Sequence, residues 1–293
     1  MIRTIENESI KIAVNDLGAE LFSLVSKKDG FEYLWQGDPT FWTGRAYNLF
    51  PICGRLIEGR YTYKGESYEM IHHGFARKNE FTVKECGDDF ISFSLCSNDE
   101  FKKQYPFDFE LIITYKLVGN SMEQIFTVKN TSAENELIFG VGGHPGFNLP
   151  LEEGMKFDDY FVEFSEDCAP KRLKMSPTCF MTDETPLYPV VDSRKLMLYH
   201  SMFDDDAIFL TDVPKEVTLR SEKNERSVTV SYPDMKYLGL WHVPKKEAPY
   251  ICIEPWYSVP AYDGKVDDLD TKRDMIHLEA GGIYENKTVI TVR

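Results

Sequence analysis

Alternation of apolar and polar residues, the two-residue period of a half-buried strand, is the dominant pattern along this chain. The repeating segments are rich in Val, Ile, Phe, Thr and Tyr and are bounded by Gly, Asn, Asp or Pro. We predict strands within 9–16, 23–27, 80–86, 89–97, 107–119, 121–131, 135–143, 160–165, 207–212, 216–222, 226–232, 237–243, 250–256, 274–278 and 284–293. Residues 61–70 are also strand-like.

The connections between these segments indicate the class of fold. Residues 107–130 predict a long hairpin that turns at Gly119-Asn120, because this pair tolerates positive φ. Helical signals are scarce, with one short helix expected in 99–107 after Asn98 or Asp99 and single turns in 39–44 and 201–206. Many strands without βαβ alternation predict an all-β fold, a large antiparallel β-sandwich with few short helices.

The chain shows no linker-like composition and no clear internal repeat. We therefore expect residues 1–293 to form a single domain. The Pro-containing stretch 166–190 is the most loop-like and is expected to cross between halves of that domain.

Composition and charge narrow the class of partner. The 20 Phe, 16 Tyr and 4 Trp can fill a large core or line a groove that stacks on sugar-like ligands. A formal charge of −15, from 48 acidic and 33 basic residues, disfavours nucleic acid as a partner. No apolar run approaches the length of a membrane span, and we expect no membrane partner.

The N-terminal residues and the cysteines bear on the compartment. The first residues lack the apolar core of an export signal. The six cysteines contain no CxxC pair, which makes a thiolate zinc site improbable. We expect a cytoplasmic protein whose six thiols are reduced and mostly buried.

His144 stands in the segment GVGGHPGFNLP, where four glycines and two prolines surround one histidine. Such a composition weakens a strand that serves stability alone. A rigid, glycine-flanked histidine at a strand end suits proton transfer, whereas the alternative is a hairpin turn with an incidental histidine.

Glu254 ends the apolar run YICI, where a carboxylate is unexpected without a partner. Burial would raise its pKa and make it a base near neutral pH. The alternative is a structural ion pair with an arginine. Pro255 is expected to end the strand, and Trp256 is expected beside a pocket.

Three further residues complete the candidate site. His73 precedes Gly74, whose bend could direct the imidazole into a cleft, and on a strand His72 would face the opposite way. Arg55 lies between apolar residues and must bind a carboxylate or a ligand oxygen. Asp206 is the member of an Asp run best placed to face inward. No spacing such as HxxxH or DxDxDG suggests a metal ion.

Around these residues the sequence resembles the aldose 1-epimerase (galactose mutarotase) superfamily, and in particular its bacterial LacX-like branch. The resemblance begins with VNDLGAEL at 14–21 and extends to the final strand. Four motifs stand in the family's order, NLFPICGRL (48–56), HHGFAR (72–77), HPGFNLP (144–150) and IEPW (253–256). HHGFAR and HPGFNL differ from the segments of the better-studied galactose mutarotases, which bears on sugar specificity.

The resemblance implies a β-supersandwich whose groove holds a sugar, and reversible opening of a hexose ring at C1. It implies that Glu254 is the base that takes the anomeric proton and that His144 is the acid that protonates the ring oxygen. His73, Arg55 and Asp206 would bind the sugar, and no cofactor or metal is implied.

Alternatives remain at this stage. Arg55, Arg60, Arg77 and Lys78 lie near the motifs, so a hexose-phosphate mutarotase is the second enzyme hypothesis. The third is a non-catalytic sugar-binding or regulatory protein on the same fold. A glycosidase is disfavoured because one carboxylate stands out where two are needed. The chain is expected to be a monomer or a homodimer.

Overall fold

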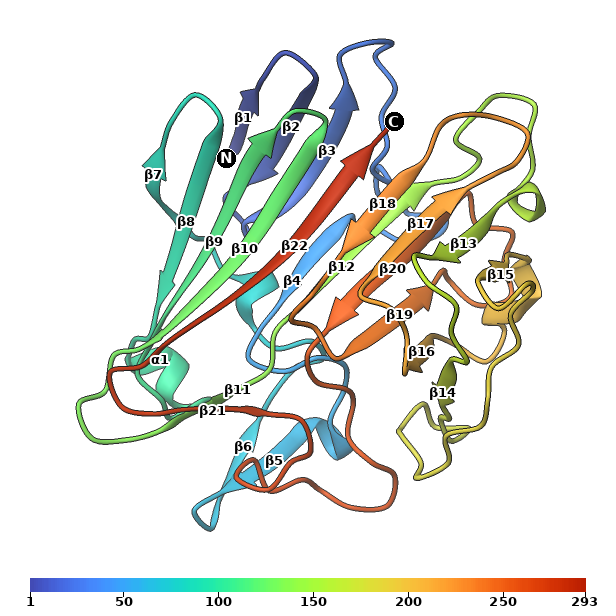
Figure 1. Ribbon diagram of the computed structural model, residues 1–293. Helices are drawn as coiled ribbons and strands as arrows, with labels where there is room; N and C mark the ends of the chain where they lie inside the picture. Colours follow the sequence, from blue (N-terminus) through green and yellow to red (C-terminus); the bar gives the residue numbers. More distant parts are fainter.

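Two large antiparallel sheets form the body of the all-β protein in a computed structural model that describes residues 1–293 (Figure 1). The nine-stranded sheet contains, in spatial order, β15 (Lys195–Met197), β13 (Phe161–Phe164), β17 (Glu216–Arg220), β18 (Val228–Ser231), β22 (Ile283–Val292), β10 (Ser121–Asn130), β9 (Phe109–Val118), β8 (Phe90–Cys96) and β7 (Thr82–Cys86). The six-stranded sheet contains β14 (Lys171–Leu173), β16 (Ile208–Thr211), β19 (Tyr237–Trp241), β20 (Tyr250–Trp256), β12 (Gly142–Asn148) and β4 (Ala46–Leu49).

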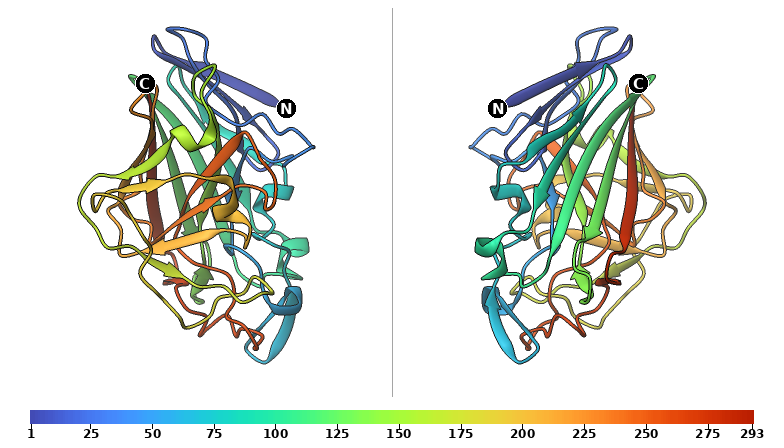
Figure 2. Two further views of the ribbon diagram at one scale, coloured as in Figure 1. Left: turned by 90° about the vertical axis from the view of Figure 1, so that its right-hand side faces the viewer. Right: turned by 90° about the vertical axis from the view of Figure 1, so that its left-hand side faces the viewer.

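Smaller sheets and short helices extend this body. The remaining strands are β1 (Ile2–Glu6), β2 (Ile10–Asn15) and β3 (Glu20–Ser26) in one sheet, the hairpin β5 (Arg60–Tyr63) and β6 (Glu66–Glu69), and the pair β11 (Leu137–Phe139) and β21 (Ile276–Leu278). The helical segments are α1 (Asp99–Lys102) and the 3₁₀ turns η1 (Ile57–Gly59), η2 (Ala76–Lys78), η3 (Phe157–Asp159) and η4 (His200–Phe203). The N-terminal sheet and the β5–β6 hairpin lie at opposite ends of the molecule (Figure 2). None of the helices has the length and apolar character needed to span a membrane.

The alternating pattern explains how the sheets bury one face. Buried and half-exposed residues alternate along the whole of β10, and its register with β9 places Gly119 and Asn120 at the predicted two-residue turn. Gly119 has a φ of +58°, which glycine adopts without strain. The largest core cluster takes residues from Ile5 to Val292, so both ends of the chain contribute to one core.

All fifteen predicted strand segments contain a strand, but two details of the prediction are wrong. Residues 135–143 break into β11 and the start of β12, which belong to different sheets. The break falls at Gly140, where a Cβ atom would lie 2.2 Å from the Ser258 hydroxyl oxygen. Pro255 does not end its strand, because β20 continues through Trp256.

The structure also tests the predictions for the loop, the helix and the cysteines. Stretch 166–190 is mainly loop, contains β14, and crosses from β13 in the nine-stranded sheet to the six-stranded sheet and back to β15. The predicted helix is confirmed as α1, where Asn98 accepts a hydrogen bond from the backbone N–H of Phe101. All six cysteines are free, but only Cys53 and Cys252 are buried, so the expectation of mostly buried thiols is wrong.

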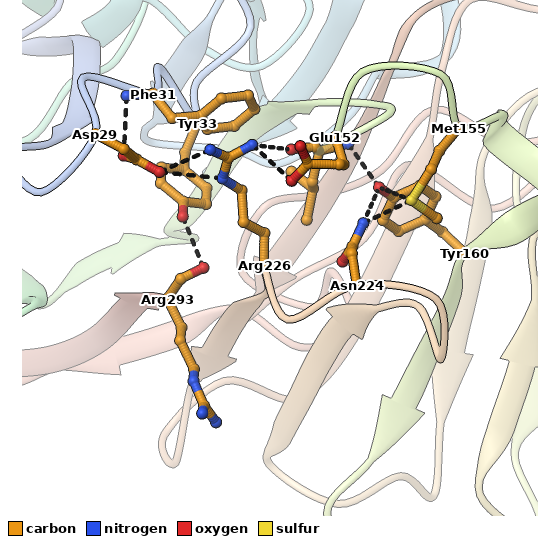
Figure 3. A network of polar contacts seen from close by, with 10 residues as sticks. Asp29, Phe31, Tyr33, Glu152, Met155, Tyr160, Asn224, Arg226 and Arg293 are labelled. Carbon is orange, nitrogen blue, oxygen red and sulfur yellow. Dashed lines mark hydrogen bonds and ion pairs between the residues drawn. The ribbon is translucent and has the colours of Figure 1, made fainter.

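A polar network on Arg226 ties the loops that follow β3 and β12 to the loop between β17 and β18 (Figure 3). The guanidinium donates to the Asp29 carboxylate at 2.7 Å and to the Glu152 carboxylate at 2.9 Å. It also lies 4.4 Å from the ring centroid of Phe31. We call these four residues the Arg226 network.

Candidate active site

A cavity of about 250 Å³ opens on the face of the six-stranded sheet that points away from the main core. All five candidate residues named from the sequence line it. The full lining is Trp42, Tyr47, Gly54, Arg55, His72, His73, Arg77, His144, Met175, Cys179, Asp206, Ala207, Phe209, Trp241, Glu254, Trp256 and Pro260.

Strand β12 presents His144 between two glycines on the same face of the strand. A Cβ atom at Gly142 would lie 2.7 Å from the indole of Trp256, and one at Gly146 would lie 3.1 Å from the indole of Trp42. Both glycines therefore allow a tryptophan to pack closely on either side of the histidine. His144 lies within β12 and pairs with Tyr47 of β4, so the expected strand-end position is wrong.

Strand β20 presents Glu254 opposite His144. The ladder between β12 and β20 pairs Gly142 with Trp256 and Gly146 with Cys252, so His144 and Glu254 fall at matching positions between these pairs. His144 Nε2 and Glu254 Oε2 are 3.4 Å apart. The alternating residues Ile251 and Ile253 point into the main core, which fixes the direction of the carboxylate.

Burial shapes the proton affinity of this pair. The exposed fraction is 1% for Glu254 and 7% for His144. Desolvation, aided by Asp206, raises the pKa of Glu254 well above its usual value. Desolvation lowers the pKa of His144 to about 3, and the cations of His72 and Arg77 would act in the same direction. Burial therefore favours the uncharged form of both side chains, so that a proton shared by the pair lies on the carboxyl group rather than on the imidazole.

Both adjacent histidines face the cavity, although a strand would have directed them to opposite sides. Residues 72 and 73 lie in a turn, where His73 has a φ of +66° and the two imidazole rings stack at 3.8 Å. Gly74 follows with a φ of +71°, and a Cβ atom there would lie 2.1 Å from the Phe50 carbonyl oxygen. The predicted opposition of the two side chains is wrong because the backbone turns.

A backbone contact fixes the tautomer of His73. Its Nδ1 accepts a hydrogen bond from the Gly54 N–H at 3.1 Å. Desolvation first, and then the charge of a protonated His72, keeps its pKa well below the usual value. The neutral ring therefore carries its proton on Nε2, and that N–H is a hydrogen-bond donor.

Arg55 and Asp206 form a charged pair at the cavity wall. Their nearest nitrogen and oxygen are 3.6 Å apart. The Trp241 indole N–H donates to the other Asp206 oxygen at 2.9 Å, which orients the carboxylate. Asp206 has a φ of +76° and directly precedes the stretch leading into β16, which places it in the cavity wall.

Trp256 lines the cavity, as the sequence predicted, but the sequence did not identify the other two tryptophans of the cavity wall, Trp42 and Trp241. Trp42 stacks on His144 with ring centroids 4.9 Å apart and planes 27° apart, and Trp241 meets His144 edge-on at 5.6 Å. Trp42 lies in the turn segment 39–44, where a large apolar side chain in a loop was the available signal. Trp35 holds this turn by donating its indole N–H to the Trp42 carbonyl oxygen at 2.9 Å.

A family model and a known relative both match this chain, and they point to the same family. The aldose 1-epimerase family model matches residues 1–262. The protein LacX of Lactococcus lactis subsp. lactis is 36% identical over 296 aligned positions, which cover 98% of this chain and 93% of LacX.

Solved structures agree with this result. A galactose mutarotase related enzyme from Lactobacillus acidophilus is 36% identical, with a TM-score of 0.95 over 100% of this chain and 97% of that chain. A galactose mutarotase-like protein from Lactobacillus casei is 32% identical, with a TM-score of 0.94 and complete coverage of both chains.

Proposed function

Because this chain belongs to the aldose 1-epimerase family, we propose that it interconverts the α and β anomers of a free hexose. The observation that carries the proposal is the buried pair of Glu254 and His144, whose side chains meet at 3.4 Å in a cavity lined by aromatic and polar side chains. Mutarotation requires the removal of one proton and the delivery of another, and such a pair can do both.

The proposed reaction begins with Glu254 as the base and His144 as the acid. Glu254 takes the proton from the hydroxyl oxygen on C1 while the bond between C1 and the ring oxygen breaks. His144 gives its proton to the ring oxygen, and C1 becomes an aldehyde. Rotation about the C1–C2 bond exposes the other face, and reclosure with exchanged roles returns both protons.

Because burial favours a neutral Glu254, we add one step to this scheme. The proton rests on Glu254 until sugar hydroxyls donate hydrogen bonds to the carboxylate, which stabilise its ionised form. His144 then carries the proton as the acid. The Nε2–H of His73 and the guanidinium of Arg55 are proposed to donate to sugar oxygens, and Asp206 is proposed to accept from a sugar hydroxyl.

The test is anomer relaxation followed by proton NMR or polarimetry. Freshly dissolved α-galactose and α-glucose are mixed with wild-type protein, Glu254→Gln and His144→Gln. We expect acceleration with the wild type and a large loss in each variant. If the folded wild-type protein bound sugar without accelerating relaxation, the chain would be a sugar-binding protein, and the proposal would be wrong.

A specific observation favours a second candidate substrate, a hexose phosphate. Arg77 lines the cavity and forms no ion pair with a carboxylate. Its guanidinium donates to the His72 carbonyl oxygen and lies 5.0 Å from the centroid of the Tyr47 ring. A free guanidinium edge is suited to a phosphate. Relaxation of α-glucose 6-phosphate against α-glucose decides between them, since a preference for the neutral sugar would eliminate this candidate.

A further inference from the structure

Cys252 completes a set of three metal-ligand side chains with Glu254 and His144. Cys252 and Glu254 are two residues apart on β20 and share a face, and His144 lies opposite on β12. One ligand atom from each of the three lies within 4.8 Å of the others, and all three residues are buried. The linear sequence indicated no metal site because this set forms across two strands.

The chemistry of the three donors matches zinc. Zinc is bound in proteins by imidazole nitrogen, thiolate sulfur and carboxylate oxygen, and its reactive sites use three protein ligands and one open position. Tetrahedral zinc with bonds of about 2.0–2.3 Å holds neighbouring ligand atoms roughly 3.3–3.7 Å apart. The His144 and Glu254 atoms are already 3.4 Å apart.

An unpartnered buried atom points independently to a further ligand. Glu254 Oε1 is buried without any hydrogen-bond partner, and the residue is 1% exposed. Buried polar atoms nearly always have a partner in folded proteins. No lysine or arginine forms an ion pair with Glu254, so no protein cation occupies the position next to it.

We propose that a zinc-like divalent cation binds His144, Cys252 and Glu254, with its fourth position open to the cavity. Binding releases the protons of the Cys252 thiol and the Glu254 carboxyl group to solvent. The thiolate and the carboxylate then balance the two positive charges, and the imidazole binds as a neutral ligand. Because the ion occupies the proposed acid and base, it inhibits anomer interconversion reversibly and competes with the sugar.

The test uses Co²⁺ as a spectroscopic probe and Zn²⁺ as the inhibitor. Protein stripped with a chelator is titrated with Co²⁺, and we expect a thiolate-to-cobalt charge-transfer band that Zn²⁺ abolishes. Zn²⁺ should slow anomer relaxation, and a chelator should restore it. Cys252→Ser should lose the band and bind Zn²⁺ about tenfold or more weakly by calorimetry, because a thiolate ligand is removed. Circular dichroism confirms that the variant is folded.

Cys179→Ser is the matched control, since Cys179 lines the same cavity but lies outside the set of three. It should keep the band and the wild-type affinity for Zn²⁺. The proposal is overturned if the wild type shows no band, or if the band survives in Cys252→Ser or disappears in Cys179→Ser. Binding is measured without any sugar, so a protein that binds the ion but lacks activity would contradict only the proposed function.

Discussion

The Arg226 network and the His144–Glu254 pair are two groups of ionisable residues in opposite environments. In the network, Arg226 meets two carboxylates at 2.7 and 2.9 Å, and its side chain is 24% exposed (Figure 3). In the cavity, Glu254 has a 1% exposed fraction, and it meets an imidazole at 3.4 Å but no lysine or arginine.

The difference appears in the direction of the pKa shifts. The hydrogen bond from Arg226 lowers the pKa of Asp29. The folded state therefore favours the ionised form of this carboxyl group, which contributes to the stability of the fold at neutral pH. Desolvation raises the pKa of Glu254, so folding disfavours its ionised form. Charges that serve structure are paired, whereas charges suited to proton transfer are left poorly solvated.

The largest expected effect is that of Glu254→Gln. If Glu254 is the base, kcat/KM for anomer interconversion falls about a thousandfold, within the usual range for a lost general base. The free energy of unfolding at pH 7 should not decrease, because the variant removes a buried group that folding keeps from ionising. Anomer relaxation and denaturant unfolding measure the two effects. A strongly destabilised variant would show that Glu254 serves structure.

The pH profile of kcat/KM tests whether burial shifts the proton affinity of the cavity pair. The pair holds one proton between the pKa of His144, about 3, and the raised pKa of Glu254. Above the pKa of Glu254 the pair loses this proton, so His144 can no longer act as the acid. There kcat/KM should fall about tenfold per pH unit. Below this pKa the rate should stay level into the mildly acidic range. Initial rates measured with a chelator present test this profile, and a fall between pH 7 and 5 would contradict it.

A smaller effect is expected for Trp42→Ala, which removes the ring that stacks on His144. Aromatic stacking contributes about 0.5–1.5 kcal/mol beyond area burial, so kcat should fall up to about tenfold through misplacement of the acid. Trp42→Phe keeps a smaller ring and should recover part of the loss. An unchanged kcat with a raised KM would instead assign Trp42 to sugar binding.

The smallest effect on activity is expected for Arg226→Met, which removes the guanidinium that holds the Arg226 network together. We expect the free energy of unfolding to fall by about 1–2 kcal/mol, since partly exposed ion pairs are individually weak and this one has several partners. Rates of anomer interconversion should equal those of the wild type. If the rate of anomer interconversion fell while the free energy of unfolding stayed at the wild-type value, the two regions would not act independently, and the comparison would be wrong.

The sequence by itself determined the strands, the all-β class and the types of residue in the cavity. Alternation is a local property, and a strand such as β10 buries every second residue wherever it packs. Unusual local settings, such as glycines around His144 and an acid after an apolar run at Glu254, could also be recognised along the chain. Their roles in catalysis and sugar binding stay predictions.

Only the tertiary structure decided which side chains meet. The register of β12 against β20 brings Cys252 and Glu254 to His144, and no linear spacing encodes that register. The turn at His73 directs both histidines into the cavity, and the packing of segment 39–44 places Trp42 on His144. Strand pairing and loop packing depend on contacts between residues far apart in the chain, and burial, which shifts the pKa values of the site, exists only after those contacts form.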